Sequence, residues 1–137
     1  MTDTQKLEPS ANTIMVVEPD SLARMVIAEY LRECGYKVLE GVRADDVFSV
    51  LNDGGNIGIV FSEVPLPGEL DGFGLATKIR ENHPEVDVLL TRGVASAAEK
   101  VGNLCDEGPL KKPYHPQEVV RRINLLREKR RTAKKPL

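Results

Sequence analysis

Cysteine is scarce in this sequence of 137 residues, and the two that occur form no metal-binding pattern. Cys34 and Cys105 stand far apart in the chain, and neither belongs to a Cys-x-x-Cys pair or to a cysteine–histidine spacing typical of zinc sites. A structural zinc centre is therefore excluded. We expect both cysteines to be unpaired thiols of the kind found in cytoplasmic proteins.

Long hydrophobic runs are also missing. No apolar stretch approaches the ~20 residues that a membrane span requires, and the first residues, up to Thr13, are polar. A chain of this length suits one domain, which buries roughly 70% of the surface that the unfolded chain exposes. No internal repeat or linker divides the sequence. We expect a soluble, cytoplasmic, single-domain protein that makes no contact with membrane.

Positive charge is concentrated at the C-terminal end. The formal net charge is -2, yet residues 121–137 hold eight Lys/Arg and one Glu, so that the residues before them are clearly acidic. A solvated helix end explains this stretch. Nucleic-acid binding is the weaker alternative, because neither a helix-turn-helix pattern nor aromatic stacking residues accompany the charge.

Short apolar runs alternate with helical patterns from Thr13 onward, which is typical of βα units on a parallel sheet. Strands that are buried on both faces are rich in β-branched residues and leucine. Five such runs occur, at residues 14–17, 38–39, 57–61, 86–90 and 109–110. The last is the weakest, because Pro109 lacks a backbone donor. The pattern predicts an α/β fold with a doubly wound parallel sheet.

Helical periodicity follows each run. In the first helix the apolar residues fall between Leu22 and Leu31, with Asp20 or Ser21 as N-cap and Gly35 as terminator. The other helices are expected at about 44–51, from Gly72 to just before His83–Pro84, at 95–103 and from Pro116 onward. The fourth contains few large apolar residues, so we expect it to pack lightly and to be the most mobile. The expected organisation is a flexible segment 1–12, one domain 13–127 and a basic tail 128–137.

Charged and polar side chains follow four of the predicted strands. They are Glu18-Pro19-Asp20, Ser62-Glu63, Thr91-Arg92-Gly93 and Lys111-Lys112-Pro113. Ligands of a doubly wound sheet bind at the carboxyl ends of its strands. The sequence therefore predicts that acids, a hydroxyl and a lysine converge on one edge of the sheet.

This order and spacing resemble the receiver domains of two-component response regulators, over residues 13 to about 127. In that family an acidic pair follows the first strand, an aspartate the third, Thr or Ser the fourth, and Lys-Pro the fifth. Pro67, the Asp71-Gly72 pair and Lys112-Pro113-Tyr114 add to the similarity. The resemblance implies a flavodoxin-like five-stranded sheet of order 2-1-3-4-5 flanked by five helices, and a cis peptide between Lys112 and Pro113.

The resemblance also implies phosphorelay chemistry. Receivers accept a phosphoryl group from a kinase histidine onto the aspartate, assisted by Mg²⁺. In this chain Glu63 stands at the phosphoacceptor position, and the other matching residues are Glu18 as the first acid, Thr91 as the switch hydroxyl and Lys112 as the phosphate-binding lysine. The partners implied are a histidine kinase, a phosphotransfer protein or a downstream signalling protein. A homodimer through the fourth and fifth helices is a further expectation.

Two departures from the family pattern fall on the phosphorylation machinery itself. Pro19 stands where the second acid of the pair would be and offers no side-chain oxygen to a metal. Glu63 is longer than aspartate by one C–C bond of roughly 1.5 Å, which moves its carboxylate toward the place of a phosphoryl group. We expect a poor acceptor and at most a weak Mg²⁺ site, built from Glu18, Asp20 and Glu63.

The same glutamate suggests a second role. A carboxylate that reaches Lys112 and Thr91 would imitate part of the charge of an aspartyl phosphate. We interpret the chain as an atypical receiver, or pseudo-receiver, that acts through protein–protein interaction. The alternative is a working single-domain response regulator. An enzyme is not expected, since no nucleophile is paired with a base, and an FMN-binding flavodoxin is excluded because the acidic residues Glu18 and Asp20 would repel a phosphate.

Overall fold

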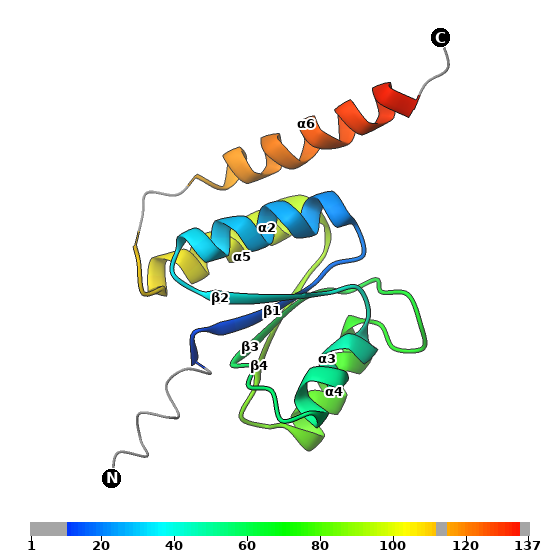
Figure 1. Ribbon diagram of the computed structural model, residues 1–137, viewed down its shortest axis with the longest axis vertical. Helices are drawn as coiled ribbons and strands as arrows, with labels where there is room; N and C mark the ends of the chain where they lie inside the picture. The colour runs from blue at the N-terminus through cyan, green and yellow to red at the C-terminus, as the bar shows by residue number, and fades with distance from the viewer. Residues whose placement is uncertain (1–10, 112–114, 135–137) are drawn as a thin grey trace.

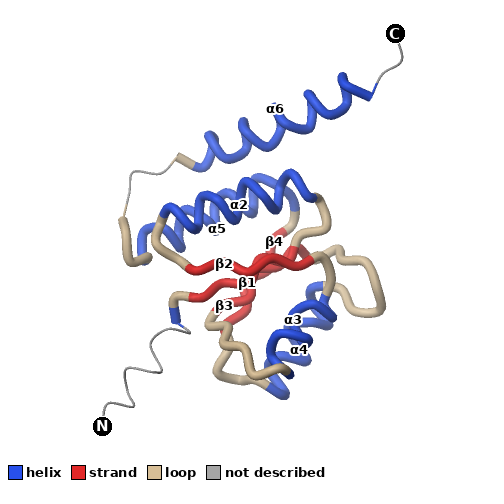
Figure 2. Tube along the Cα trace, in the orientation of Figure 1, coloured by secondary structure: helices blue, strands red, loops and turns tan. Residues whose placement is uncertain are grey.

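The computed structural model describes residues 11–111 and 115–134. Its parallel sheet has the order β2-β1-β3-β4, as Figure 2 shows in red. The strands are β1 (Thr13–Val17), β2 (Lys37–Gly41), β3 (Ile59–Glu63) and β4 (Asp87–Thr91). The α/β class, the parallel sheet and the order of these four strands are confirmed. The predicted third and fourth strands begin and end one or two residues early, so that Glu63 and Thr91 are the last residues of their strands.

Helices cover both faces of the sheet, and one helix forms an additional layer (Figure 1). They are α2 (Ser21–Glu33), α3 (Ala44–Asn52), α4 (Gly72–Asn82), α5 (Gly93–Glu107) and α6 (Pro116–Lys134). The helices α2 and α5 lie on one face, α3 and α4 on the other, and α6 lies outside α2 and α5. The predicted basic tail from residue 128 therefore begins inside α6. Among the described helices, none combines the length and apolar character needed to cross a membrane.

Two hydrophobic clusters hold these layers together. The larger joins the sheet to α2, α5 and α6 and includes Phe61, Leu31 and Ile123, and the smaller joins the sheet to α3 and α4 and includes Leu75. The residues that α5 buries are mostly small, namely Ala97, Ala98, Val101, Gly102, Leu104 and Cys105. Because α5 also contacts α2, α6 and β4, the light packing expected from its composition stays a prediction.

The predicted fifth strand is wrong for the residues that the structure describes. Pro109 and Leu110 pair with no strand, and the Leu110 N–H instead donates to the carbonyl oxygen of Cys34 at 3.0 Å. Gly35, with φ of +97°, lies so close that a Cβ atom there would come within 3.0 Å of the Pro109 side chain. Because proline cannot donate to a strand ladder, this segment binds to the turn after α2. The predicted cis bond at Lys112–Pro113 lies outside the described residues.

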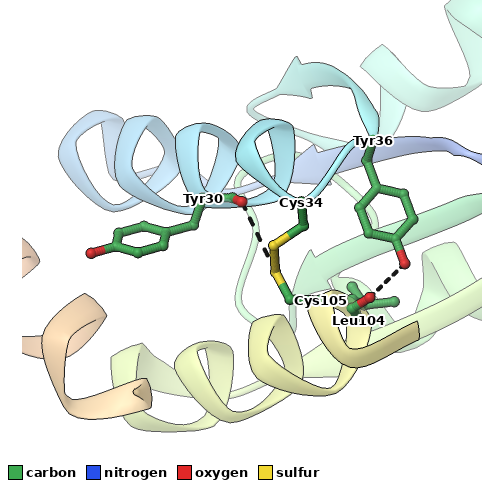
Figure 3. The surroundings of a disulfide bond; sticks show 5 residues. All are labelled: Tyr30, Cys34, Tyr36, Leu104 and Cys105. Carbon is green, nitrogen blue, oxygen red and sulfur yellow. Dashed lines mark hydrogen bonds between the residues drawn. A yellow bond between two sulfur atoms is a disulfide. The ribbon is translucent and has the colours of Figure 1, made fainter. Parts of the chain in front are cut away.

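The two cysteines form a disulfide bond, which corrects the expectation of unpaired thiols (Figure 3). Cys34 is the C-cap residue of α2, and Cys105 lies in the last turn of α5. Their sequence separation is 71 residues, and no local motif announces the pairing. Packing of α5 beside α2 brings the two sulfur atoms together.

Candidate functional site

Glu63 ends β3 beside Thr91, the last residue of β4, with which it is in register. Both of its carboxylate oxygens accept from the Gly93 backbone N–H, at 2.9 and 3.1 Å, and the Thr91 hydroxyl lies 3.4 Å from one of them. Arg92, the N-cap residue of α5, makes no side-chain capping bond. Glu63 therefore acts as the cap of α5, where a carboxylate is favoured by unpaired N–H groups and the helix dipole.

Glu18 lies in the loop after β1 and is 9% exposed. One of its carboxylate oxygens accepts from the Asp20 N–H at 2.9 Å. Burial raises the pKa of Glu18, and the nearby charges of Glu63 and Asp20 raise it further, against the lowering effect of that hydrogen bond. The charges of Glu63 and Asp20 thus act on Glu18 at one edge of the sheet.

Asp20 is fully engaged by contacts within the protein. One oxygen caps α2 by accepting from the N–H groups of Leu22 and Ala23, at 2.9 and 3.3 Å. The other oxygen binds the guanidinium of Arg127 on α6, at 2.8 Å from Nε and 2.6 Å from Nη2. Burial alone would raise the pKa of Asp20, but the Arg127 hydrogen bond and the two backbone donors together hold this pKa below its usual range.

These carboxylates do not fit the Mg²⁺ site expected from Glu18, Asp20 and Glu63. Mg²⁺ requires near-octahedral oxygen ligation. Both oxygens of Glu63 and both of Asp20 already accept hydrogen bonds, and Pro19 has no side-chain oxygen. Among the described residues no group of three or more Asp, Glu, His or Cys side chains is arranged to hold a metal ion. The Arg127 guanidinium supplies the positive charge beside Asp20.

The Arg127–Asp20 contact predicts a pH-dependent stability difference. Because the folded pKa of Asp20 is lowered, its contacts stabilise the fold above about pH 4, and this stabilisation is lost as the pH falls through the lowered pKa. Arg127→Gln should lower the free energy of unfolding by less than about 1 kcal/mol at pH 7, since both side chains are partly exposed. The difference should shrink as the pH falls below about 4, as measured by urea denaturation at several pH values.

Arg131→Gln is the matched control. Arg131 lies one turn further along α6 and pairs with Glu128 of the same helix. Its loss should not change the pH dependence below about pH 4, where the stabilisation by the Asp20 contacts is lost. Arg127 also lowers the pKa of Glu18, so its loss raises that pKa further and adds, in the same direction, to the difference seen for Arg127→Gln. A difference for Arg127→Gln that stays constant across the pH range would contradict this assignment.

The structure brings together four of the sequence-predicted site residues, Glu18, Asp20, Glu63 and Thr91. The predicted contact between Glu63 and Thr91 is present. Lys112 and Pro113 lie outside the described residues, so the contact of Lys112 with Glu63 stays a prediction. Sequence reasoning missed the donor at Gly93, because the helix was predicted to begin at residue 95 and the structure begins it at Gly93. It also missed Arg127, which no local pattern could have connected to Asp20.

Comparison with known proteins agrees with this geometry. The family model described as "Response regulator receiver domain" matches residues 14–124. The chain therefore belongs to the response regulator receiver domain family. It is a receiver domain of two-component phosphorelay signalling. Among curated proteins, this receiver is 28% identical over 120 residues to "Sensor kinase CckA" of Brucella abortus (strain 2308), covering 85% of the chain and 13% of that kinase.

A second relative is "Transcriptional regulatory protein SrrA" of Staphylococcus aureus, 25% identical over 119 residues, with 85% of the receiver and 48% of that protein covered. The receiver thus spans less than half of either relative. A response regulator receiver domain from Clostridium thermocellum has a TM-score of 0.55 at 21% identity, covering 88% of this chain and 98% of that one. A chain in the complex of histidine kinase ThkA with response regulator TrrA has a TM-score of 0.55 at 23% identity, covering 61% of this chain and 70% of that chain. Both structural likenesses show the fold.

Proposed function

We propose that this receiver is a pseudo-receiver, in which the Glu63 carboxylate takes the place of a phosphorylated aspartate. The observation that carries the proposal is the occupation of both Glu63 oxygens by the Gly93 N–H, with the Thr91 hydroxyl beside one of them. A carboxylate at a helix N-terminus is stabilised by typically 0.3–1 kcal/mol. The negative charge that phosphorylation would bring is therefore present in part without any phosphoryl group.

The same contacts make Glu63 a poor phosphoryl acceptor. Transfer in line requires one carboxylate oxygen to be free and placed accurately against the phosphorus atom. Here both oxygens share the Gly93 N–H, so an attacking oxygen would have to give up its part of that bond and leave the capping of α5 to the other oxygen. No Mg²⁺ ligand set among the described acids is available to assist this step. We infer that the receiver is not an enzyme and is little controlled by phosphorylation.

Protein–protein interaction is then the means of signalling. The described surface beside Glu63 carries Phe73, which is 52% exposed, and the Arg92 guanidinium lies 5.5 Å from the centre of its ring. An exposed aromatic next to an arginine is typical of protein-binding surfaces. The proposed partner is a histidine kinase, a phosphotransfer protein or a downstream signalling protein in the cytoplasm. A homodimer through α5 and α6, and boundaries of 13–127 for the functional domain, remain predictions.

Incubation with acetyl phosphate and Mg²⁺ tests the proposal. We expect no acid-labile phosphate on the wild type by intact mass spectrometry, because the Glu63 oxygens are engaged and the metal ligands are incomplete. The combined variant Pro19→Asp with Glu63→Asp should accept phosphate, since it regains both a metal ligand and a shorter acceptor. Glu69→Asp, an exposed change in the loop before α4, is the control and should behave as the wild type does.

The outcome for the wild type decides between the two functions. Stoichiometric, acid-labile labelling of the wild type would reject the pseudo-receiver and support a working single-domain response regulator. Labelling confined to the combined variant would show that the substitutions at positions 19 and 63 explain the lack of phosphorylation.

A further inference from the structure

α5 is held at each end by a group from another part of the chain. Glu63 of β3 binds the N–H of its first residue, and Cys34 at the end of α2 is bonded to Cys105 in its last turn (Figure 3). We propose that Cys34 and Cys105 are a reversible redox site that exchanges with small disulfides of the glutathione class. Oxidation fastens the last turn of α5 to α2 covalently, and reduction leaves that turn held by noncovalent contacts alone. This inference does not rest on the phosphorylation state of the receiver.

The backbone is already arranged for the bond. The Cα atoms of the two cysteines are 5.3 Å apart, within the 4.4–6.8 Å that disulfides usually span. Cys34 is fixed at the end of α2 because its N–H donates to the carbonyl oxygens of Tyr30 and Leu31, at 3.2 and 3.1 Å. Oxidation therefore needs little movement of either helix.

Noncovalent contacts hold the two segments together when the sulfur–sulfur bond is absent. The Tyr36 hydroxyl donates to the Leu104 carbonyl oxygen at 2.6 Å, directly beside the cysteine pair (Figure 3). On the other side, the Leu110 N–H donates to the Cys34 carbonyl oxygen at 3.0 Å. These two bonds bracket Cys105 along the chain, so the reduced thiols stay close to each other. A high effective concentration of one thiol at the other makes the bond easy to re-form.

Access to the pair depends on local opening. Cys105 is fully buried and Cys34 is 3% exposed, so a small disulfide must wait until the turn from Cys34 to Tyr36 moves away. Cys34 is the residue reached first, because it lies at the end of its helix.

The proposed thiol–disulfide exchange needs no reagent other than the small disulfide. The Cys34 thiolate attacks one sulfur of the small disulfide, forms a mixed disulfide and releases one small thiol. The Cys105 thiolate then attacks the Cys34 sulfur, forms the internal bond and releases the second small thiol. The protein loses two electrons and two protons, and the small disulfide is reduced to two thiols. Reduction by excess thiol follows the same steps in reverse.

The redox state of the two cysteines can affect the protein surface through α6. Val119 and Ile123 of α6 are fully buried in the same hydrophobic cluster as both cysteines. The buried residues of α5 in that cluster are Ala97, Ala98, Val101, Leu104 and Cys105, so the cluster includes the last turn that the disulfide fastens. Loss of the covalent bond at the last turn of α5 therefore loosens the support on which α6 lies. The proposed redox site would change the surface that α5 and α6 present to a partner.

A redox titration of the full chain tests the proposal. The protein is equilibrated in glutathione mixtures from fully reduced to fully oxidised, quenched by alkylation and weighed by intact mass spectrometry. We expect one two-electron transition between dithiol and internal disulfide within that range. Hydrogen exchange at the backbone amides of Leu104–Glu107 should become at least tenfold faster in the reduced protein, with β1 and β3 unchanged.

Two variants separate this mechanism from others. In Cys34→Ala, the backbone amides of Leu104–Glu107 should exchange hydrogen as fast as in the reduced wild type, both in reduced and in oxidised glutathione. Tyr36→Phe keeps the ring but loses the hydroxyl bond to Leu104, so the equilibrium constant for the internal disulfide against glutathione should fall several-fold. A bond that survives fully reduced glutathione would show a permanent cross-link and overturn the proposal. The proposal would also be overturned if, in oxidised glutathione, the two thiols stayed free or stopped at a mixed disulfide. A redox transition that left the hydrogen-exchange rate of the α5 amides unchanged would overturn it as well.

Discussion

Replacing Cys105 by alanine should lower the free energy of unfolding of the oxidised receiver by about 4 kcal/mol. The disulfide links residues 71 positions apart, so it restricts a large part of the unfolded chain. In the chain-entropy description the stabilisation grows with the logarithm of the closed loop, from about 3 kcal/mol for 15 residues to about 4.7 for 100. Alanine is the suitable replacement because the site is fully buried and a serine hydroxyl would add an unpaired polar group. Urea denaturation at pH 7 without reductant measures the loss.

Reduced wild-type receiver is the matched control for this variant. It contains the same unrestricted unfolded chain, so its free energy of unfolding should lie within about 1 kcal/mol of that of Cys105→Ala. Agreement between the two would assign the loss to the bond itself. A loss below about 1 kcal/mol in the oxidised variant would mean that the two cysteines are not joined in solution.

The sequence was most informative where structure is local. The apolar periodicity of 22–31, with Asp20 or Ser21 as N-cap, predicted α2 nearly to the residue, and the acid and hydroxyl at the ends of two strands predicted that Glu63 would meet Thr91. Both inferences depend on rules that act within a few residues or between adjacent strand ends. Four strands followed from apolar patterns of the same local kind, and the family followed from the resemblance of the residues at the strand ends to those of receivers.

What the sequence did not reveal depends on contacts between distant residues. The Cys34–Cys105 bond and the Arg127–Asp20 ion pair join positions 71 and 107 residues apart. Neither contact has a local signature in the sequence. For the ion pair, any of several cationic residues near the C-terminus could have been the partner of Asp20. They became visible only once α5 and α6 were placed against α2.

The prediction of a fifth strand was wrong for a different reason. The run at Pro109–Leu110 is short, and a proline that lacks an N–H is a poor member of a ladder. The carbonyl oxygen of Cys34, at the end of α2, offered the Leu110 N–H a nearer partner. Leu110 is consequently 55% exposed, where a buried strand would have covered it. A local contact at the helix end thus outweighed a weak strand preference.

The position of α6 leads to the second large effect. Ile123 is fully buried where α6 meets α2 and α5, and its replacement by alanine removes apolar contacts and leaves a cavity. We expect Ile123→Ala to lower the free energy of unfolding by about 3 kcal/mol. Weaker packing of α6 against α2 and α5 should also make the peptide bonds after Arg127 and Lys129 more accessible to trypsin. Urea denaturation and the rate of tryptic cleavage measure the two effects.

Leu125→Ala supplies the control on the same helix. Leu125 is 47% exposed and lies two residues from Ile123, on the side of α6 that faces away from the cluster. Its truncation should change the free energy of unfolding by less than about 0.5 kcal/mol, because surface changes of this kind are nearly neutral. Equal losses for the two variants would mean that α6 is not packed against α2 and α5 through Ile123. A large loss for Ile123→Ala alone would establish the third layer of the fold and, with it, the surface through which α6 supports Asp20.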